Sequence, residues 1–136
     1  MIRPIMKDPL FLAGKSRDAV MTDLPIAMDL KDTLHANRDI CAGMAANMIG
    51  FRVRIICITA GPSEILMLNP VIISRKKPYE TEEGCLSLSG MRKTIRYETI
   101  TVRYQDTGFR QKTGTYSGFA AQVIQHEIDH CSGILI

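Results

Sequence analysis

The sequence lacks the features that mark membrane, secreted and repeat proteins. No apolar run approaches the roughly 20 residues needed to span a bilayer, and the segment that begins at Met1 has no long apolar stretch of the kind found in signal peptides. The four cysteines show no tight paired spacing, and internal repeats and low-complexity tracts are absent. We therefore expect a cytoplasmic protein with reduced thiols, folded as one domain over residues 1–136.

Positive charge is too sparse to indicate a nucleic-acid partner. The formal net charge is +3, and the only short basic run, residues 75–77, precedes Pro78 in a segment with the look of a loop. A solvated turn explains this run better than a nucleic-acid contact does. The hydrophobic content of 46% and the charged content of 23% are typical of a soluble globular protein, so no membrane partner is expected either.

The spacing of apolar residues predicts two helices. Over residues 25–40, apolar side chains recur at every fourth position after a capping residue and an early proline. Residues 117–131 form the second helix, which we expect to be buried because it carries the chemical motif described below. Prolines and a glycine interrupt residues 1–22, so this segment is predicted to be an irregular arm.

Branched apolar residues predict strands between the two helices. Residues 53–58 and 65–73 are strongly apolar, whereas residues 94–97 and 99–104 alternate with polar side chains and predict half-exposed strands. A turn at residues 106–108 follows them. The expected fold is α+β, with antiparallel strands packed around a C-terminal helix and one N-terminal helix.

The pattern H-E-x-x-H at residues 126–130 is the strongest chemical signal. His126 and His130 are four positions apart, so on a helix they share a face and can bind one metal ion. Glu127 can take a proton from a metal-bound water. An ordinary charged helix can also carry this pattern, but two of the three histidines in the chain fall within it, and Cys85 stands upstream in a Gly-Cys turn. These two observations favour a metal site.

Cys85 is the third candidate ligand. One thiolate and two imidazoles leave a coordination position open for water or substrate, as in catalytic rather than structural sites. This donor set suits several divalent ions and does not choose among them. The remaining histidine, His35, has no partner at ligand spacing and is expected at the surface or its boundary, while Cys41 and Cys57 are expected to be small core residues.

Three motifs together resemble those of the peptide deformylases, hydrolases that remove the formyl group from the initiator methionine of new bacterial polypeptides. The first two are EGCLS at residues 83–87 and QHEIDH at residues 125–130. The third family motif, G-x-G-L-A-A-x-Q, is partly matched by CAGMAANM at residues 41–48. Order and spacing agree across nearly the whole chain, which therefore resembles one deformylase-like catalytic domain.

The resemblance implies a metal-dependent deformylase mechanism. Cys85, His126 and His130 would hold the ion, Glu127 would move the proton, and the Leu86 backbone N–H would help the metal to hold the oxyanion. Family resemblance favours Fe2+ in the cell, with Zn2+ or Ni2+ common after purification. The implied partner is the formylated N-terminus of nascent polypeptides, and association with the ribosome is left open.

One departure from the family motif concerns catalysis. Met48 stands where the family has a glutamine that donates a hydrogen bond to the formyl oxygen, and a thioether cannot donate. Losing one oxyanion donor typically costs about 10²–10³ in kcat. Asn47 carries an amide, but one position early, which is about 100° around a helix. Cys41 replaces the first glycine of the motif, while Gly43 keeps the second.

A second departure concerns the substrate pocket. The resemblance places Gly43 in the substrate-binding segment and the methionine side-chain pocket near Phe119, Gln122 and Val123. Phe119 and Val123 suit an apolar side chain, but Gln122 is polar where an apolar residue is expected. Substrate preference is therefore predicted to be broader than formyl-methionine, or different from it.

Two alternatives to an efficient deformylase stay open at this point. A deformylase-like metal-binding protein that has lost turnover and binds peptide N-termini would explain Met48 and Cys41, but it would have no evident need for Glu127. The H-E-x-x-H pattern would also fit a zinc protease, but the upstream cysteine and the chain length do not fit one. We expect the enzyme, with activity lowered by Met48.

Overall fold

A meandering antiparallel sheet organises the protein, and its five strands pair in chain order. The computed structural model describes residues 1–135. Its helices, 3₁₀ turns (η) and strands are, in order, α1 (Pro9–Leu12), η1 (Met21–Asp23), α2 (Leu24–Ala36), β1 (Gly43–Ala45), η2 (Ala46–Ile49), β2 (Ile55–Ala60), β3 (Ser63–Cys85), β4 (Leu88–Gln105), β5 (Gln111–Ser117) and α3 (Gly118–Cys131). The predicted α+β class is confirmed, with α3 as the C-terminal helix.

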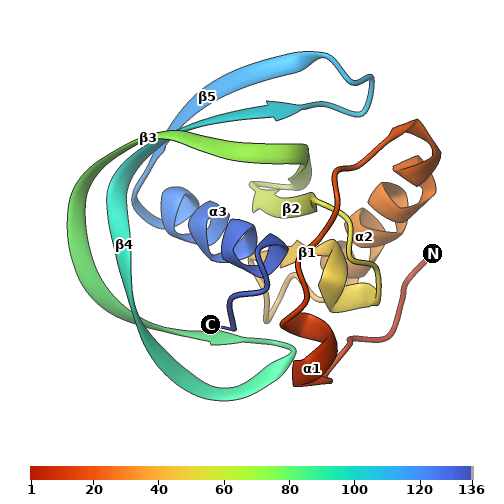
Figure 1. The fold of residues 1–136 in the computed structure, drawn as a ribbon, viewed down its shortest axis with the longest axis horizontal. Coiled ribbons are helices and arrows are strands. Elements are labelled where there is room, and N and C mark those ends of the chain that lie inside the picture. The colour runs from red at the N-terminus through yellow and green to blue at the C-terminus, as the bar shows by residue number, and fades with distance from the viewer. Residues whose placement is uncertain (136) are drawn as a thin grey trace.

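Helix α3 lies on the concave side of the sheet, and the long strands β3 and β4 curve around it (Figure 1). Apolar residues three or four positions apart give α3 one face that packs against the sheet. The core they form with the strands contains Ala121, Ile124, Cys131, Ile56, Met67, Ile100 and Val102. Full burial of an isoleucine side chain stabilises the fold by roughly 1.5–3 kcal/mol. This packing fixes the helix that carries the H-E-x-x-H pattern.

Strand β2 is buried on both faces and separates two cores. Ile56 and Ile58 contact the α3 core, whereas Ile55 and Cys57 contact a second core formed with α2. Successive side chains of a strand point to opposite faces, so alternate residues enter different cores. The second core also contains Ala27, Leu30, Leu34, Met44 and Met48.

The helix boundaries differ from the predictions in two places. The N-terminal arm is not wholly irregular, because Asp8 caps helix α1 by accepting a backbone N–H of the first turn at 3.0 Å. Pro9 occupies the start of that helix, where its missing N–H costs nothing. Helix α2 ends at Ala36 rather than at residue 40, and Asn37 Nδ2 satisfies the Thr33 carbonyl of its last turn at 2.8 Å.

The strands predicted in the regions of β3 and β4 were too short, and the loop predicted at residues 75–77 is wrong. These residues lie within β3 and pair with β4, while residues 94–97 and 99–104 belong to one continuous strand. Exposed polar side chains dominate this part of β3, so the sequence shows no apolar alternation there. Register shifts between Leu68 and Val71 and after Ile72 mark β-bulges, which increase the twist and help the hairpin to bend around α3.

Two strands escaped the sequence analysis altogether. β1 has only three residues, and β5 is rich in Gln, Lys and Thr, so neither gives a periodic apolar signal. β1 pairs with β2 and brings Gly43 beside α3, and β5 pairs with the second half of β4. Within the described part of the chain, none of the helices has the length and apolar character needed to cross a membrane.

Candidate metal centre

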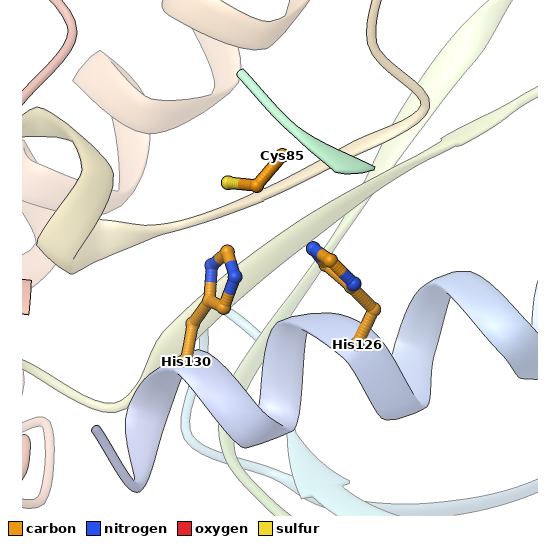
Figure 2. Close-up of side chains that lie close together, drawn as sticks. All are labelled: Cys85, His126 and His130. Carbon is orange, nitrogen blue, oxygen red and sulfur yellow. The ribbon is translucent and has the colours of Figure 1, made fainter. Parts of the chain in front are cut away.

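The three predicted ligands come together at the point where the hairpin ends against α3. One candidate ligand atom from each of Cys85, His126 and His130 lies within 4.8 Å of the others. Figure 2 shows the two imidazoles rising from successive turns of α3 toward the thiol of Cys85, which is the last residue of β3. The ring centroids of the two histidines are 4.5 Å apart. Both histidines are buried and Cys85 is half-buried.

The Cys85 thiol is held in its ligand form by its neighbours. Burial alone would raise its pKa, but contacts with His126 and His130 outweigh that effect and lower the pKa to about 6. The same contacts act against burial in the histidines, raising the pKa of His126 to about 9 and that of His130 to about 11. These shifts of pKa favour positive charge beside the Cys85 sulfur, and a divalent metal ion would supply that charge in place of the protons.

Glu127 lies beside these ligands as a buried carboxylate with an unsatisfied oxygen. Its side chain is 4% exposed, and Oε1 lies 3.3 Å from His130 Nδ1 without a hydrogen-bond partner among the described residues. A buried acceptor left unpaired costs roughly 1–3 kcal/mol, and more when it is charged. Such an oxygen, next to one thiolate and two imidazoles, fits a site built for a divalent metal and a water.

A buried charge network behind His126 was missed by the sequence analysis. Glu83 Oε1 contacts His126 Nδ1 at 2.8 Å, and Arg96 grips the same carboxylate through Nε and Nη2. The second terminal nitrogen of Arg96 donates to Asp129 at 2.6 Å. Burial would raise the pKa of Glu83, but contacts with His126, Arg96 and Gln122 outweigh it and hold the pKa at about 2. Carboxylate partners of this kind orient ligating histidines.

One signal for this network was present in the sequence. Glu83 and Asp129 both stand within the two motifs that supply the ligands, as charged residues without an assigned role. Arg96 was harder to find, because in the strand that contains it the charged residue is 4% exposed while the neighbouring Ile95 is 58% exposed. That inversion of the usual pattern is visible only in the folded protein.

A cavity of about 250 Å³ opens beside the ligands and gathers most of the predicted site residues. Besides Cys85, His126 and Glu127, its lining includes the predicted residues Gly43, Met48, Leu86, Phe119, Gln122 and Val123. Phe119 is 68% exposed and therefore lies at the rim. His130 lies outside this lining and borders a smaller neighbouring cavity.

Met48 and Asn47 take different positions, although they are adjacent in η2. Met48 is buried at the cavity, and its sulfur accepts the Ala45 N–H at 3.5 Å. Asn47 is equally buried, but its Nδ2 donates to the His130 carbonyl at 3.0 Å. The amide of Asn47 is therefore committed to the last turn of α3 and is not directed at the cavity.

The first motif fits closely against α3. A Cβ on Gly43 would lie 2.6 Å from Val123 Cγ1 and 3.2 Å from Glu127 Cγ, so only glycine lets β1 pass here. Cys41, expected in the core, is instead half-buried at the cavity, where its thiol donates to the Gly43 carbonyl at 2.8 Å. Burial, with a contribution from Glu127, raises the pKa of Cys41 to about 12, so this thiol stays protonated.

The other two side-chain predictions agree with the structure. Cys57 is completely buried in the core. His35 is exposed, and its Nδ1 lies 2.6 Å from Glu64 Oε1. Among the described residues, neither belongs to the Cys85, His126 and His130 cluster.

Fold and site together define a small α+β protein with a Cys-His-His cluster that could hold a metal ion. The sequence matches the profile of the polypeptide deformylase family over residues 4–136, and the chain belongs to this family. It is 55% identical to a peptide deformylase of Clostridium beijerinckii over 136 residues, which cover all of both chains. It is 34% identical to a peptide deformylase of Dictyoglomus thermophilum, covering all of this chain and 91% of the relative.

Solved structures give the same answer. A peptide deformylase from Legionella pneumophila matches with a TM-score of 0.89 at 31% identity, covering 99% of this chain and 83% of that one. The enzyme from Thermus thermophilus matches with a TM-score of 0.86 at 34% identity, covering 99% and 84%. The long curved hairpin around a C-terminal helix is thus a family fold, as the sequence motifs predicted.

Proposed function

We propose that this chain is a metal-dependent deformylase in which Cys85, His126 and His130 hold one divalent ion and Glu127 moves the proton. Membership of the family makes it a hydrolase that removes the N-formyl group of peptides, a step of N-terminal processing in protein biosynthesis. One observation carries the assignment of residues. Three ligand atoms within 4.8 Å of one another lie next to a buried, unsatisfied carboxylate at the base of a cavity.

The metal defines the chemistry of the site, and the protein residues supply the rest. When bound, a divalent ion acts as a Lewis acid toward the formyl oxygen and lowers the pKa of a water. The donor set of one thiolate and two imidazoles suits Fe2+, Zn2+ and Ni2+. We assign Fe2+ to the protein in the cell, with Zn2+ or Ni2+ as substitutes.

Glu127 is placed to act as general base and then as general acid. Its carboxylate lines the cavity, is shielded from bulk water, and has one oxygen available. It takes the proton of the attacking water and delivers it to the leaving amine, a role that typically contributes about 10²–10⁴ to the rate. His130 Nδ1 lies 3.3 Å from that oxygen, so the carboxylate is next to a proposed metal ligand.

Leu86 supplies the backbone donor of the oxyanion site. It follows Cys85 directly in the tight turn between β3 and β4 and lines the cavity. A backbone N–H aimed at a developing negative charge stabilises the transition state without any reorganisation. Met48, which also lines the cavity, contributes no side-chain donor, because its sulfur can only accept.

The substrate is the formylated N-terminus of nascent polypeptides, and Gly43, Phe119, Gln122 and Val123 shape the pocket for its first side chain. The methyl groups of Val123 and the ring of Phe119 give that pocket an apolar wall. We place the protein in the cytoplasm, where it would meet such chains as they leave the ribosome, with residues 1–136 acting as one catalytic domain.

A metal-binding protein without turnover is the less favoured function. Identity of 55% to a peptide deformylase extends over the whole chain, and Glu127 supplies a buried carboxylate with an unsatisfied oxygen, for which a protein without turnover has no evident need. Met48 lowers activity on this account but does not remove the machinery. The zinc protease is set aside by family membership.

A deformylation assay tests the proposal. Protein purified anaerobically and loaded with Fe2+ should release formate from a formyl-Met-Ala-Ser peptide. Prior removal of the metal with a strong chelator should abolish release, and re-addition of Fe2+ should restore it. Turnover that survives complete metal removal, or an absence of turnover in the loaded protein, would contradict the proposal.

A further inference from the structure

A half-buried glutamine of α3, Gln122, connects the cavity to the charge network behind His126. Its Nε2 donates to Glu83 Oε2 at 2.9 Å. The other oxygen of that carboxylate contacts His126 Nδ1 at 2.8 Å. We propose that Gln122 is a positioning residue for the metal ligands, which acts by fixing the orientation of the Glu83 carboxylate. The inference rests on the proposed metal site and adds a role that the position of Gln122 in the substrate pocket does not explain.

The two oxygens of Glu83 have different donors. Oε1 receives Arg96 Nη2 at 2.7 Å and His126 Nδ1 at 2.8 Å. Oε2 receives Gln122 Nε2 at 2.9 Å. Arg96 Nε is shared, at 3.1 Å from Oε1 and 3.0 Å from Oε2. Within the described part of the chain, Gln122 is thus the one side chain that donates to Oε2 alone.

The carboxylate needs such a partner because its terminal torsion is soft. That torsion has a broad, roughly two-fold profile. Arg96 Nη2 and His126 Nδ1 both contact Oε1, and Arg96 Nε is shared between the two oxygens, so Oε2 has no donor of its own apart from Gln122 among the described residues. The other terminal nitrogen of Arg96 donates to Asp129 at 2.6 Å, so the guanidinium is shared between two carboxylates. With Gln122 on Oε2, the carboxylate is held in the plane that keeps Oε1 against His126 Nδ1. This contact leaves Nε2 of His126 as the ligand atom and makes it a stronger base.

The same hydrogen bond changes what Gln122 offers to a substrate. Gln122 lines the cavity, and its bond to Glu83 takes one of the two N–H donors of Nε2, so less of its hydrogen-bonding capacity is left for a substrate. The polar residue at this position therefore serves the metal ligands. The preference for an apolar first side chain should survive its replacement by leucine.

Metal affinity tests the inference on the whole protein. Zn2+ affinity would be measured by competition with a chromophoric chelator, and the ligand field by the absorption spectrum of the Co2+ form. Gln122→Leu removes the donor at similar volume, and we expect Zn2+ affinity to fall about three- to tenfold, below the 10–100-fold typical when a direct partner of a ligating histidine is lost. The Co2+ bands should shift.

Two further variants sharpen the test. Gln122→Glu should weaken Zn2+ binding more than Gln122→Leu does, because two carboxylates would then face each other. Phe119→Leu changes the same helix and the same cavity but lies outside the hydrogen-bond network, so it should leave Zn2+ affinity and the Co2+ spectrum unchanged. The thermal stability of each metal-free variant identifies any general folding defect.

The outcomes separate this inference from the proposed function. Wild-type Zn2+ affinity together with an unchanged Co2+ spectrum in Gln122→Leu would overturn the positioning role while leaving the metal site intact. Weaker binding with a wild-type Co2+ spectrum would also count against it, because a merely structural defect lowers affinity without moving the bands. Failure of the wild-type protein to bind Zn2+ or Co2+ would overturn the proposed function itself.

Discussion

The α3 core and the outer part of the β3–β4 hairpin, which is the exposed stretch that includes Ile73 and Ile95, are stabilised in different ways. Around α3, apolar side chains such as Ile100 are completely buried, and β2 is covered on both faces. Along the outer hairpin, Ile73 and Ile95 are 49% and 58% exposed, and strand pairing does most of the stabilising there. The proposed metal ligands lie where these regions meet, with His126 and His130 on α3 and Cys85 at the closed end of the hairpin (Figure 2).

The two regions supply different parts of the site. The two histidines are fixed by the packing of a helix, and their spacing follows from helical geometry alone. The third ligand and the Leu86 backbone reach the site only because a long hairpin bends around that helix.

The largest effect is expected from Cys85→Ala, which removes the hairpin's ligand. We expect loss of the bound metal and of hydrolysis, because two imidazoles alone leave the ion underligated. Elemental analysis of protein purified without chelator should find close to one equivalent of metal in the wild type and almost none in the variant. Cys41→Ala is the matched control, since that thiol also lines the cavity but stays protonated. Equal metal content in the two variants would remove Cys85 from the ligand set.

Glu127→Ala tests the helix side of the site without changing a ligand. We expect metal content to be kept and kcat to fall by about 10²–10⁴, the usual contribution of a positioned acid or base. Steady-state kinetics on a formyl-Met peptide and metal analysis of the same sample measure both quantities. Wild-type turnover would show that Glu127 has been given the wrong role, whereas loss of the metal would make it a ligand or an essential support.

Two isoleucines of the same strand compare the regions directly. Ile100→Ala should cost about 2–5 kcal/mol in the free energy of unfolding, because it opens a cavity against α3. Ile95→Ala, on the exposed part of β4, should change it by less than about 0.5 kcal/mol. Urea denaturation of the two variants under identical metal loading measures the difference. Similar costs for both would mean that the outer hairpin is as tightly packed as the core.

The smallest effect is expected from Met48→Gln, a gain of function. A glutamine there would add a donor toward the developing oxyanion, and the gain should appear in kcat rather than in KM. We expect about tenfold rather than the full 10²–10³ of a missing donor, because the metal and the Leu86 N–H already act on that charge. Full kinetics on a formyl-Met peptide provide the measurement.

Asn47→Ala is the companion variant. Since the Asn47 amide is bound to the His130 carbonyl, this change should weaken stability and leave the rate of the remaining folded protein nearly unchanged. A large loss of kcat at unchanged stability would identify Asn47 as a substitute donor. No gain in Met48→Gln would then have a ready explanation.

Much of the fold could be predicted because apolar periodicity records burial. The two long helices and the apolar strands were found in this way, since Leu30, Leu34 and the residues of β2 face a core. The outer halves of β3 and β4 could not be found, because a strand exposed to water needs no apolar pattern. The Pro78 that suggested a loop is accommodated within β3, next to Lys77 with its positive φ of 60°.

The clustering of Cys85, His126 and His130 could be predicted, because the spacing of the residues carries the signal. A histidine pair on one helix face is visible in sequence, and a family motif supplied Cys85. The Glu83–Arg96–Asp129 network could not be predicted, because its members come from β3, β4 and α3 and meet only when the hairpin closes on the helix. The role of Gln122 was hidden for the same reason.

The double burial of β2 has a further consequence for the motions of the molecule. Its backbone amides bond to β1 or β3 within the sheet and have packed side chains above and below. Solvent deuterium can then reach these amides chiefly when the whole protein opens, whereas the outer hairpin can exchange through local openings. The rate of hydrogen exchange in β2 should therefore report the global stability of the protein. Exchange in the outer parts of β3 and β4, the strands that bring Cys85 to the site, should be faster and report local opening of the hairpin.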